Sequence, residues 1–162
     1  MIRPVTKQDA QAIVDIYNHY VENTVITFEE ENINESEMLK RIEKVVNSNL
    51  PWLVILEDDI VLGYAYATPW KARSAYRHSA EATVYLAPKE HGRGLGTQLY
   101  QALFAELKRT SVHSVIGGIT LPNPASIALH EKLGMTEVAS FKQVGLKFKQ
   151  WLDVGYWQIT LN

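Results

Sequence analysis

The amino-acid sequence predicts an α/β (α+β) fold in which one mixed β-sheet is flanked by helices. Stretches with period-two alternation are interleaved with stretches whose apolar residues recur every three or four positions. The runs 52–56 and 60–68, separated by a short acidic turn, are typical of an antiparallel hairpin. A third run, 80–86, is followed by a glycine-rich turn and a helix. With 162 residues, 46 % of them hydrophobic, the chain suits one domain over 1–162.

The first part of the chain is predicted to contain one strand and two helices. Residues 2–5 form the strand, and Thr6 with Asp9 resembles a helix cap before apolar residues at helical spacing. A second helix over 35–46 carries its apolar residues on one face, and the segment 47–51 ends it.

The central strand, 80–86, has two distinct faces. Glu81, Thr83 and Tyr85 share one face, while the alternate residues share the other. A helix follows, on which leucines recur at every fourth position from Leu99. The elements predicted beyond it are a strand at 114–120, a helix from Asn123 closed by Gly134, and strands at 137–141 and 154–161.

The turn before the central helix contains three glycines at alternate positions, Gly92, Gly94 and Gly96. Glycine lets the backbone approach a ligand closely, and the first N–H groups of a helix lack partners inside it. The turn from Gly92 to Thr97 therefore predicts a phosphate site, to which Arg93 adds a positive charge. The alternative is a glycine-rich loop selected for tight turning alone. Neither the P-loop nor the dinucleotide fingerprint fits the spacing.

Composition excludes several classes of function. A net charge of −2 gives no general attraction to nucleic acid or to an anionic membrane, and no apolar run is long enough to span a bilayer. The chain has no cysteine, so an acyl-cysteine intermediate is impossible. Its five histidines are scattered, so we expect no metal. The N-terminus lacks an apolar signal core, and we expect a cytoplasmic protein.

Two motifs resemble the GCN5-related N-acetyltransferase (GNAT) family. The glycine-rich turn is similar to the family pattern Gln/Arg-x-x-Gly-x-Gly/Ala, with His91 at the first position, and the segment 123–135 resembles Asn-x-x-Ala-x-x-Leu-Tyr-Glu-Lys-Leu-Gly-Phe. The resemblance implies the GNAT fold and acetyl-CoA as co-substrate, with its pyrophosphate on the turn. The cofactor-binding residues that it implies are Val84, Tyr85, Leu86, Gly92, Arg93, Gly94, Leu95, Gly96, Thr97 and Asn123. For Asn123, plain helix capping is the alternative.

Two residues are candidates for catalysis. Formation of an amide from a thioester needs a neutral amine, so a base must first take a proton. Glu81 lies on the central strand just before the turn, and the resemblance favours it as this base over a solvated strand carboxylate. His130 stands where most of the superfamily has a tyrosine read as the acid. It is a base, an acid or a packing histidine.

The loop 69–78 suggests that the substrate carries an anionic group. Its positive charges, Lys71, Arg73 and Arg77, lie beside aromatic residues that include Tyr76, in a chain that is acidic overall. An arginine fork matches a carboxylate or phosphinate, although a solvated loop or a patch facing a phosphate of CoA is the alternative.

Within the family, the chain resembles the phosphinothricin N-acetyltransferase branch most. Trp70, His130 and Trp151-x-Asp153 are among the residues that carry this resemblance. That branch implies acetylation of the α-amino group of phosphinothricin, methionine sulfone or methionine sulfoximine, and a homodimer. Further substrate-binding candidates are Phe28, Glu29 and Thr83, with Lys147 as a weaker one supplied by a neighbouring subunit. For the segment holding Phe28 and Glu29, a plain connection between helices is equally consistent. The rival functions are acetylation of another small amine, such as a polyamine or aminoglycoside, and CoA binding without catalysis.

Overall fold

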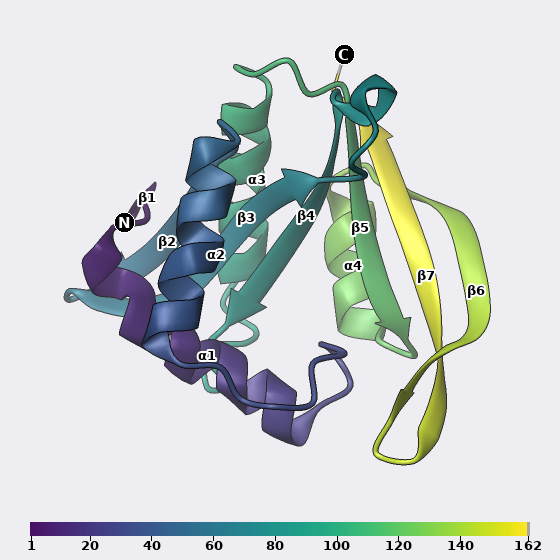
Figure 1. Cartoon of the computed structure of the whole chain (residues 1–162), viewed down its shortest axis with the longest axis horizontal. Coiled ribbons are helices and arrows are strands. Elements are labelled where there is room, and N and C mark those ends of the chain that lie inside the picture. Colours follow the sequence, from purple (N-terminus) through teal and green to yellow (C-terminus); the bar gives the residue numbers. More distant parts are fainter. Residues whose placement is uncertain (162) are drawn as a thin grey trace.

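The computed structural model describes residues 1–161 and contains one seven-stranded sheet with helices on both faces (Figure 1). This confirms the predicted fold class; residue 162, the last of the predicted domain, lies outside the described residues. The strand order is β1-β2-β3-β4-β5-β7-β6. No helix within 1–161 has both the length and the apolar character needed to cross a bilayer. The elements are β1 (Ile2–Pro4), η1 (Lys7–Asp9), α1 (Ala10–Asn23), α2 (Glu35–Asn47), β2 (Trp52–Glu57), β3 (Ile60–Pro69), η2 (Ser74–Tyr76), β4 (Ser79–Leu86), α3 (Leu95–Leu107), β5 (Ser114–Leu121), α4 (Pro124–Lys132), β6 (Thr136–Lys147) and β7 (Gln150–Thr160).

Strand β2 is buried on both faces and divides two hydrophobic cores. Leu53 and Ile55 belong to the core under α3, while Trp52, Val54 and Leu56 belong to the core under α1 and α2. A strand covered on both sides needs no polar alternation, which explains why 52–56 is a continuous apolar run.

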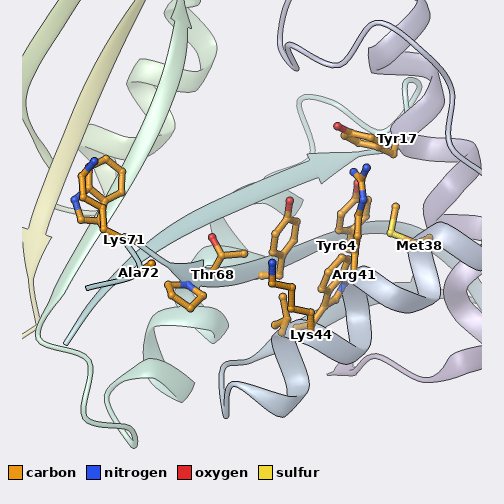
Figure 2. Close-up of a pocket in the computed structure, with 13 residues that line it drawn as sticks. Tyr17, Met38, Arg41, Lys44, Tyr64, Thr68, Lys71 and Ala72 are labelled. Atoms are coloured by element: carbon orange, nitrogen blue, oxygen red, sulfur yellow. The ribbon is translucent and has the colours of Figure 1, made fainter. Parts of the chain in front are cut away.

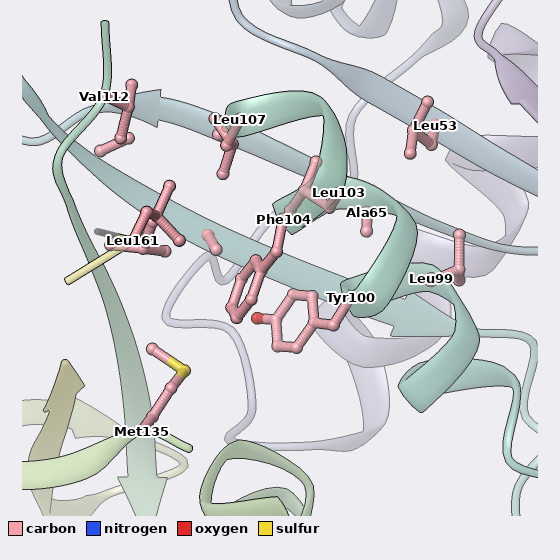
Figure 3. Close-up of a cluster of buried hydrophobic side chains, with 14 of the residues drawn as sticks. Leu53, Ala65, Leu99, Tyr100, Leu103, Phe104, Leu107, Val112, Met135 and Leu161 are labelled. Carbon is pink, nitrogen blue, oxygen red and sulfur yellow. The ribbon is translucent and has the colours of Figure 1, made fainter. Parts of the chain in front are cut away.

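Helix α3 is fixed on the sheet by an apolar face. Leu99, Leu103 and Leu107 are fully buried, and Tyr100 is 1 % exposed. Figure 3 shows these side chains packed over the strands beside Leu53. Each buried side chain of this size contributes about 1.5–3 kcal/mol. The start of α3, where the glycine-rich turn ends, is therefore held rigidly against the sheet.

The predicted cap before α1 is present as a short 3₁₀ turn. The Asp9 carboxylate accepts a hydrogen bond from the Thr6 backbone N–H at 2.7 Å and pairs with both terminal nitrogens of Arg3 at 2.8 and 2.9 Å. These contacts, with that to Arg3 the largest, hold the pKa of Asp9 below its usual value.

Strands β4 and β5 form the parallel pair of the sheet and separate soon after they begin. They pair over Ser79–Glu81 and Ser114–Ile116, although β4 continues to Leu86 and β5 to Leu121. Figure 1 shows the two strands diverging toward their carboxyl ends. The backbone of the second half of β4 is thus left unpaired on the β5 side.

The last two strands are longer than predicted. Strand β6 extends to Lys147 and β7 starts at Gln150, so the predicted strands 137–141 and 154–161 were wrong in extent. Most of β6 is exposed on both faces and its register shifts twice against β7, which removes the alternation that marks a strand in sequence.

Candidate active site

The gap between β4 and β5 opens onto a groove beside the glycine-rich turn, called here the turn groove. Its volume is about 290 Å³, and the end of β4, the start of α3 and the start of α4 enclose it. Every residue predicted to bind the cofactor lines it except Arg93. They are Val84, Tyr85, Leu86, Gly92, Gly94, Leu95, Gly96, Thr97 and Asn123.

The glycines of the turn serve its backbone conformation. Gly92 and Gly94 have φ of +80° and +75°, in the left-handed region that favours glycine, and a Cβ at either would meet nothing within 4 Å. Helix α3 begins directly after Gly94, so residues 95–97, which the sequence placed in the turn, form its first helical turn instead. Because Gln98 N–H donates to Gly94 O at 3.1 Å, the N–H groups of 95–97 have no partner inside the helix. This end is suited to an anion.

Arg93 is not a free positive charge in this structure. Its guanidinium pairs with Glu57 at 2.7 Å and with Glu90. Its charge is therefore offset by two carboxylates, and the helix start supplies the attraction for an anion.

Helix α4 positions two of the predicted residues, because Asn123 caps its start and His130 lies in its last turn. The Asn123 side-chain oxygen accepts a hydrogen bond from Ser126 N–H at 3.1 Å, as expected of a helix cap, while the residue also lines the turn groove. His130 is 3 % exposed, and its Nδ1 lies 2.7 Å from Ser126 O. Since a carbonyl accepts, Nδ1 carries the proton and Nε2 is left as the acceptor of the neutral ring.

The surroundings of His130 favour this neutral form. Burial lowers the pKa of the imidazole, and the Tyr100 hydroxyl lies 3.4 Å from Nε2. The ring rests on Gly117 of β5, where a Cβ would stand 2.7 Å from Nε2. His130 also lines a small hollow of about 60 Å³ together with Thr83 of β4.

Glu81 lies where β4 and β5 begin to separate. It is the last β4 residue paired with β5, and on its other side it faces Thr68 of β3. It is half-buried, and burial raises the pKa of its carboxyl group, which makes it a stronger base than an exposed glutamate.

A second cavity, called here the aromatic pocket, lies between α2 and strand β3, on the other side of Glu81 from the turn groove. Its volume is about 530 Å³. Thr68 lines it, and side chains directly opposite in an antiparallel pair share a face, so Glu81, which does not itself line the pocket, lies beside its rim. Figure 2 shows Arg41, Tyr64 and Met38 grouped at one end of this space and Lys71 with Ala72 at the other, with Thr68 between them. It is lined by Tyr17, Met38, Arg41, Lys44, Val45, Trp52, Tyr64, Tyr66, Thr68, Pro69, Trp70, Lys71 and Ala72.

Glu29 is held by residues beside the aromatic pocket. Its carboxylate accepts from Tyr17 OH at 2.6 Å and from both terminal nitrogens of Arg41. Phe28 lies against Gly145 of β6, where a Cβ would stand 2.3 Å from the ring. The connection between α1 and α2 is therefore fixed from both sides, although neither Phe28 nor Glu29 lines the pocket.

The basic loop divides between two cavities. Lys71 lines both the aromatic pocket and a neighbouring surface hollow of about 640 Å³, whereas Arg73 and Arg77 line only that hollow, together with Arg109. Tyr76 is 40 % exposed and lines neither. The structure thus brings one of the three predicted basic residues next to the pocket at Glu81.

Lys147 lies inside its own chain instead of reaching out to a neighbour. It is 1 % exposed, and its ammonium donates to Thr27 O at 2.8 Å. Burial lowers its pKa. This contact ties β6 to the connection between α1 and α2.

Sequence reasoning missed most of the aromatic pocket. Arg41 and Lys44 are on a charged helix face that is indistinguishable in sequence from a solvated one. Thr68 acquires its place through strand register with Glu81, for which the sequence holds no direct signal. The sequence predicts Trp52 only as the first residue of a strand, yet its side chain forms part of the pocket wall, and its ring N–H is a buried donor without an acceptor within residues 1–161.

Comparison with known proteins agrees with this arrangement. Residues 2–155 match the acetyltransferase (GNAT) domain family. The chain is 40 % identical to a phosphinothricin N-acetyltransferase of Streptomyces viridochromogenes, over 97 % of this chain and 85 % of that protein. It is 37 % identical to an L-methionine sulfoximine/L-methionine sulfone acetyltransferase of Salmonella typhimurium, over 99 % of this chain and 94 % of the other.

A solved structure shows the same architecture. The phosphinothricin acetyltransferase of Sinorhizobium meliloti, determined in complex with acetyl-CoA, superposes with a TM-score of 0.97 at 34 % identity, covering 100 % of this chain and 88 % of the other. The family match and the identity both extend over nearly the whole chain. The protein therefore belongs to the GNAT family of acetyltransferases.

Proposed function

We propose that the protein transfers the acetyl group of acetyl-CoA to the α-amino group of a small amino acid, with phosphinothricin, methionine sulfone and methionine sulfoximine as substrates. The observation that carries this proposal is the separation of β4 from β5 after Glu81, which leaves this carboxylate between the turn groove, suited to an anion, and the aromatic pocket beside Thr68. The substrate class is supported by the named activities of the relatives.

The turn groove suits the CoA portion of the co-substrate. The free N–H groups of 95–97 would hold the pyrophosphate, and the unpaired edge of β4 at Val84–Leu86 would hydrogen-bond the amide-containing arm. Tyr20 supports this end of β4, because its hydroxyl donates to Leu86 O at 2.5 Å.

Glu81 is proposed as the base. It takes one proton from the substrate ammonium, directly or through a water, and the freed nitrogen attacks the thioester carbonyl. The C–N bond forms and the C–S bond breaks to release the CoA thiolate, and the second proton of the nitrogen passes to this thiolate, directly or through water, to give the CoA thiol. The raised pKa of Glu81 improves its match to an amine.

Of the three roles open to His130, which are acid, base and packing residue, its neutral form disfavours the acid. An acid that protonates the thiolate would need a proton on Nε2, and the lowered pKa of the ring opposes this. A base for the amine or a packing residue remains consistent with the contacts, and His130→Phe separates them: loss of turnover at retained stability supports the base.

The aromatic pocket disfavours a polycationic acceptor. Arg41, Lys44 and Lys71 line it, and no aspartate or glutamate does. A polyamine or aminoglycoside would meet like charges there. An amino acid places one amine at Glu81 and presents its other groups to the pocket.

The proposal is tested by acetyl transfer over a panel of amino acids and polyamines. Glu81→Gln should lower kcat by about 10²–10⁴-fold, with the calorimetric Kd of acetyl-CoA unchanged. Glu137→Gln, an exposed strand carboxylate, is the matched control. Acetylation of polyamines but not of amino acids would overturn the substrate class, and acetyl-CoA binding without transfer to any amine would favour the non-catalytic alternative.

A homodimer is the proposed assembly. The hairpin of β6 and β7 exposes large apolar side chains, including Leu146 at 52 %, Phe148 at 57 % and Trp151 at 59 %. Such a cluster is typical of an interaction surface. Light scattering should give twice the chain mass, and Leu146→Asp should give a monomer.

Use of acetyl-CoA supports a cytoplasmic location, which cell fractionation would test.

A further inference from the structure

The aromatic pocket contains three cations, and one of them is already neutralised. Arg41 pairs with Glu29 through both terminal nitrogens and with Glu37 through Nε at 3.2 Å. Two carboxylates therefore offset its charge before any ligand arrives. An acidic ligand would have to compete with both of them for this guanidinium.

In the described part of the chain, Lys44 and Lys71 are not paired with a carboxylate. None of the ion pairs within residues 1–161 includes either lysine. The Lys71 ammonium lies 5.3 Å from the centre of the Trp70 ring, a cation–π contact that occupies it in part. Lys44 comes from the last turn of α2, and Figure 2 shows its side chain extending toward Thr68.

Strand register places the proposed base, Glu81, beside the rim of the pocket where Thr68 lies. Thr68 is opposite Glu81, so a substrate amine at Glu81 lies next to Thr68 at the rim of the pocket. A substrate side chain that enters the pocket from this rim would lie along an aromatic wall. Trp52 and Tyr66 are stacked with ring centroids 4.2 Å apart, and this wall suits the methylene groups of an amino acid.

From this arrangement we infer that Lys44 is a specificity-determining residue, whose ammonium binds an acid group at the end of the acceptor side chain. The acid group is a carboxylate or a phosphinate, because both accept hydrogen bonds from an ammonium. No aspartate or glutamate among the described residues lines the pocket to repel such an anion. The inference rests on the proposed function, since it assumes that an amino acid is acetylated at Glu81.

The test compares two acceptors of similar shape and different charge. Phosphinothricin ends in a phosphinate anion, whereas methionine sulfone ends in an uncharged sulfone. Lys44→Met should lower kcat/KM for phosphinothricin about 10-fold or more, the size expected for one charge-assisted hydrogen bond, through a higher KM. For methionine sulfone the change should stay within about 2-fold, and Lys44→Arg should recover phosphinothricin turnover in part.

Lys40→Met is the matched control, because Lys40 is one turn away on the same helix, is exposed and does not line the pocket. It should leave both acceptors unchanged, and melting curves should show all three variants folded. Equal losses for the two acceptors, or none for either, would overturn the role of Lys44 while the proposed function stands. If the wild-type protein acetylates neither acceptor, the proposed function is wrong and this inference falls with it.

Discussion

The contact between His130 and Gly117 gives a sharp prediction, because adding one methyl group should displace the ring. In Gly117→Ala the new Cβ would stand 2.7 Å from His130 Nε2 and 2.8 Å from Cδ2. Non-bonded heavy atoms settle at about 3.5–4.0 Å, so the ring must retreat by roughly 1 Å. It cannot do so easily, since Nδ1 is already bonded to Ser126 O at 2.7 Å.

The expected cost is that of overpacking a buried site. Such insertions cost about 1–3 kcal/mol, which lowers the melting temperature of a chain of this size by roughly 2–12 °C. Gly118→Ala is the control, because its Cβ would lie 3.2 Å from the Tyr156 ring, a contact that a shift of a few tenths of an ångström relieves. Thermal melts followed by circular dichroism measure both variants.

A double-mutant cycle tests the assigned cause. In the His130→Ala background the ring is absent, so Gly117→Ala should be neutral or stabilise by up to about 1 kcal/mol, because alanine restricts the unfolded chain. The same destabilisation in both backgrounds would refute the reasoning, since the clash would then lie elsewhere.

Three further predictions follow from single contacts. Gly94→Val should abolish calorimetric binding of acetyl-CoA while the fold is retained, because valine disfavours the φ of +75° at this position and would distort the turn. Undiminished binding would exclude the turn as the anion site. The kcat/KM profile of the wild type should show an acidic limb with a pKa above the ordinary value of 4.5, because burial raises that of Glu81, and the limb should vanish in Glu81→Gln. Asp9→Asn should cost about 1–2 kcal/mol at neutral pH. Because the pKa of folded Asp9 is lowered, its contribution is present above the unfolded value and is lost as pH falls through the folded one, so urea melts should show the variant and wild type converging in acid, and a constant difference would contradict the ion pair with Arg3.

The sequence by itself determined the order of the elements and the glycine-rich turn. Both are encoded locally: a buried strand needs consecutive apolar residues, and φ above zero at Gly92 and Gly94 needs glycine. The alternation that put Glu81, Thr83 and Tyr85 on one face also holds, because side-chain direction along a strand has a fixed period of two.

The tertiary structure decided which side chains meet. Thr68 faces Glu81 because of strand register, and Lys44 joins the aromatic pocket because α2 packs across β3. Arg73 and Arg77 follow Lys71 closely in sequence but line only the neighbouring hollow, whereas Lys71 and Ala72 line both cavities. Contacts of this kind depend on elements far apart in the chain, and the residues that make them carry no local pattern that distinguishes them from a solvated surface.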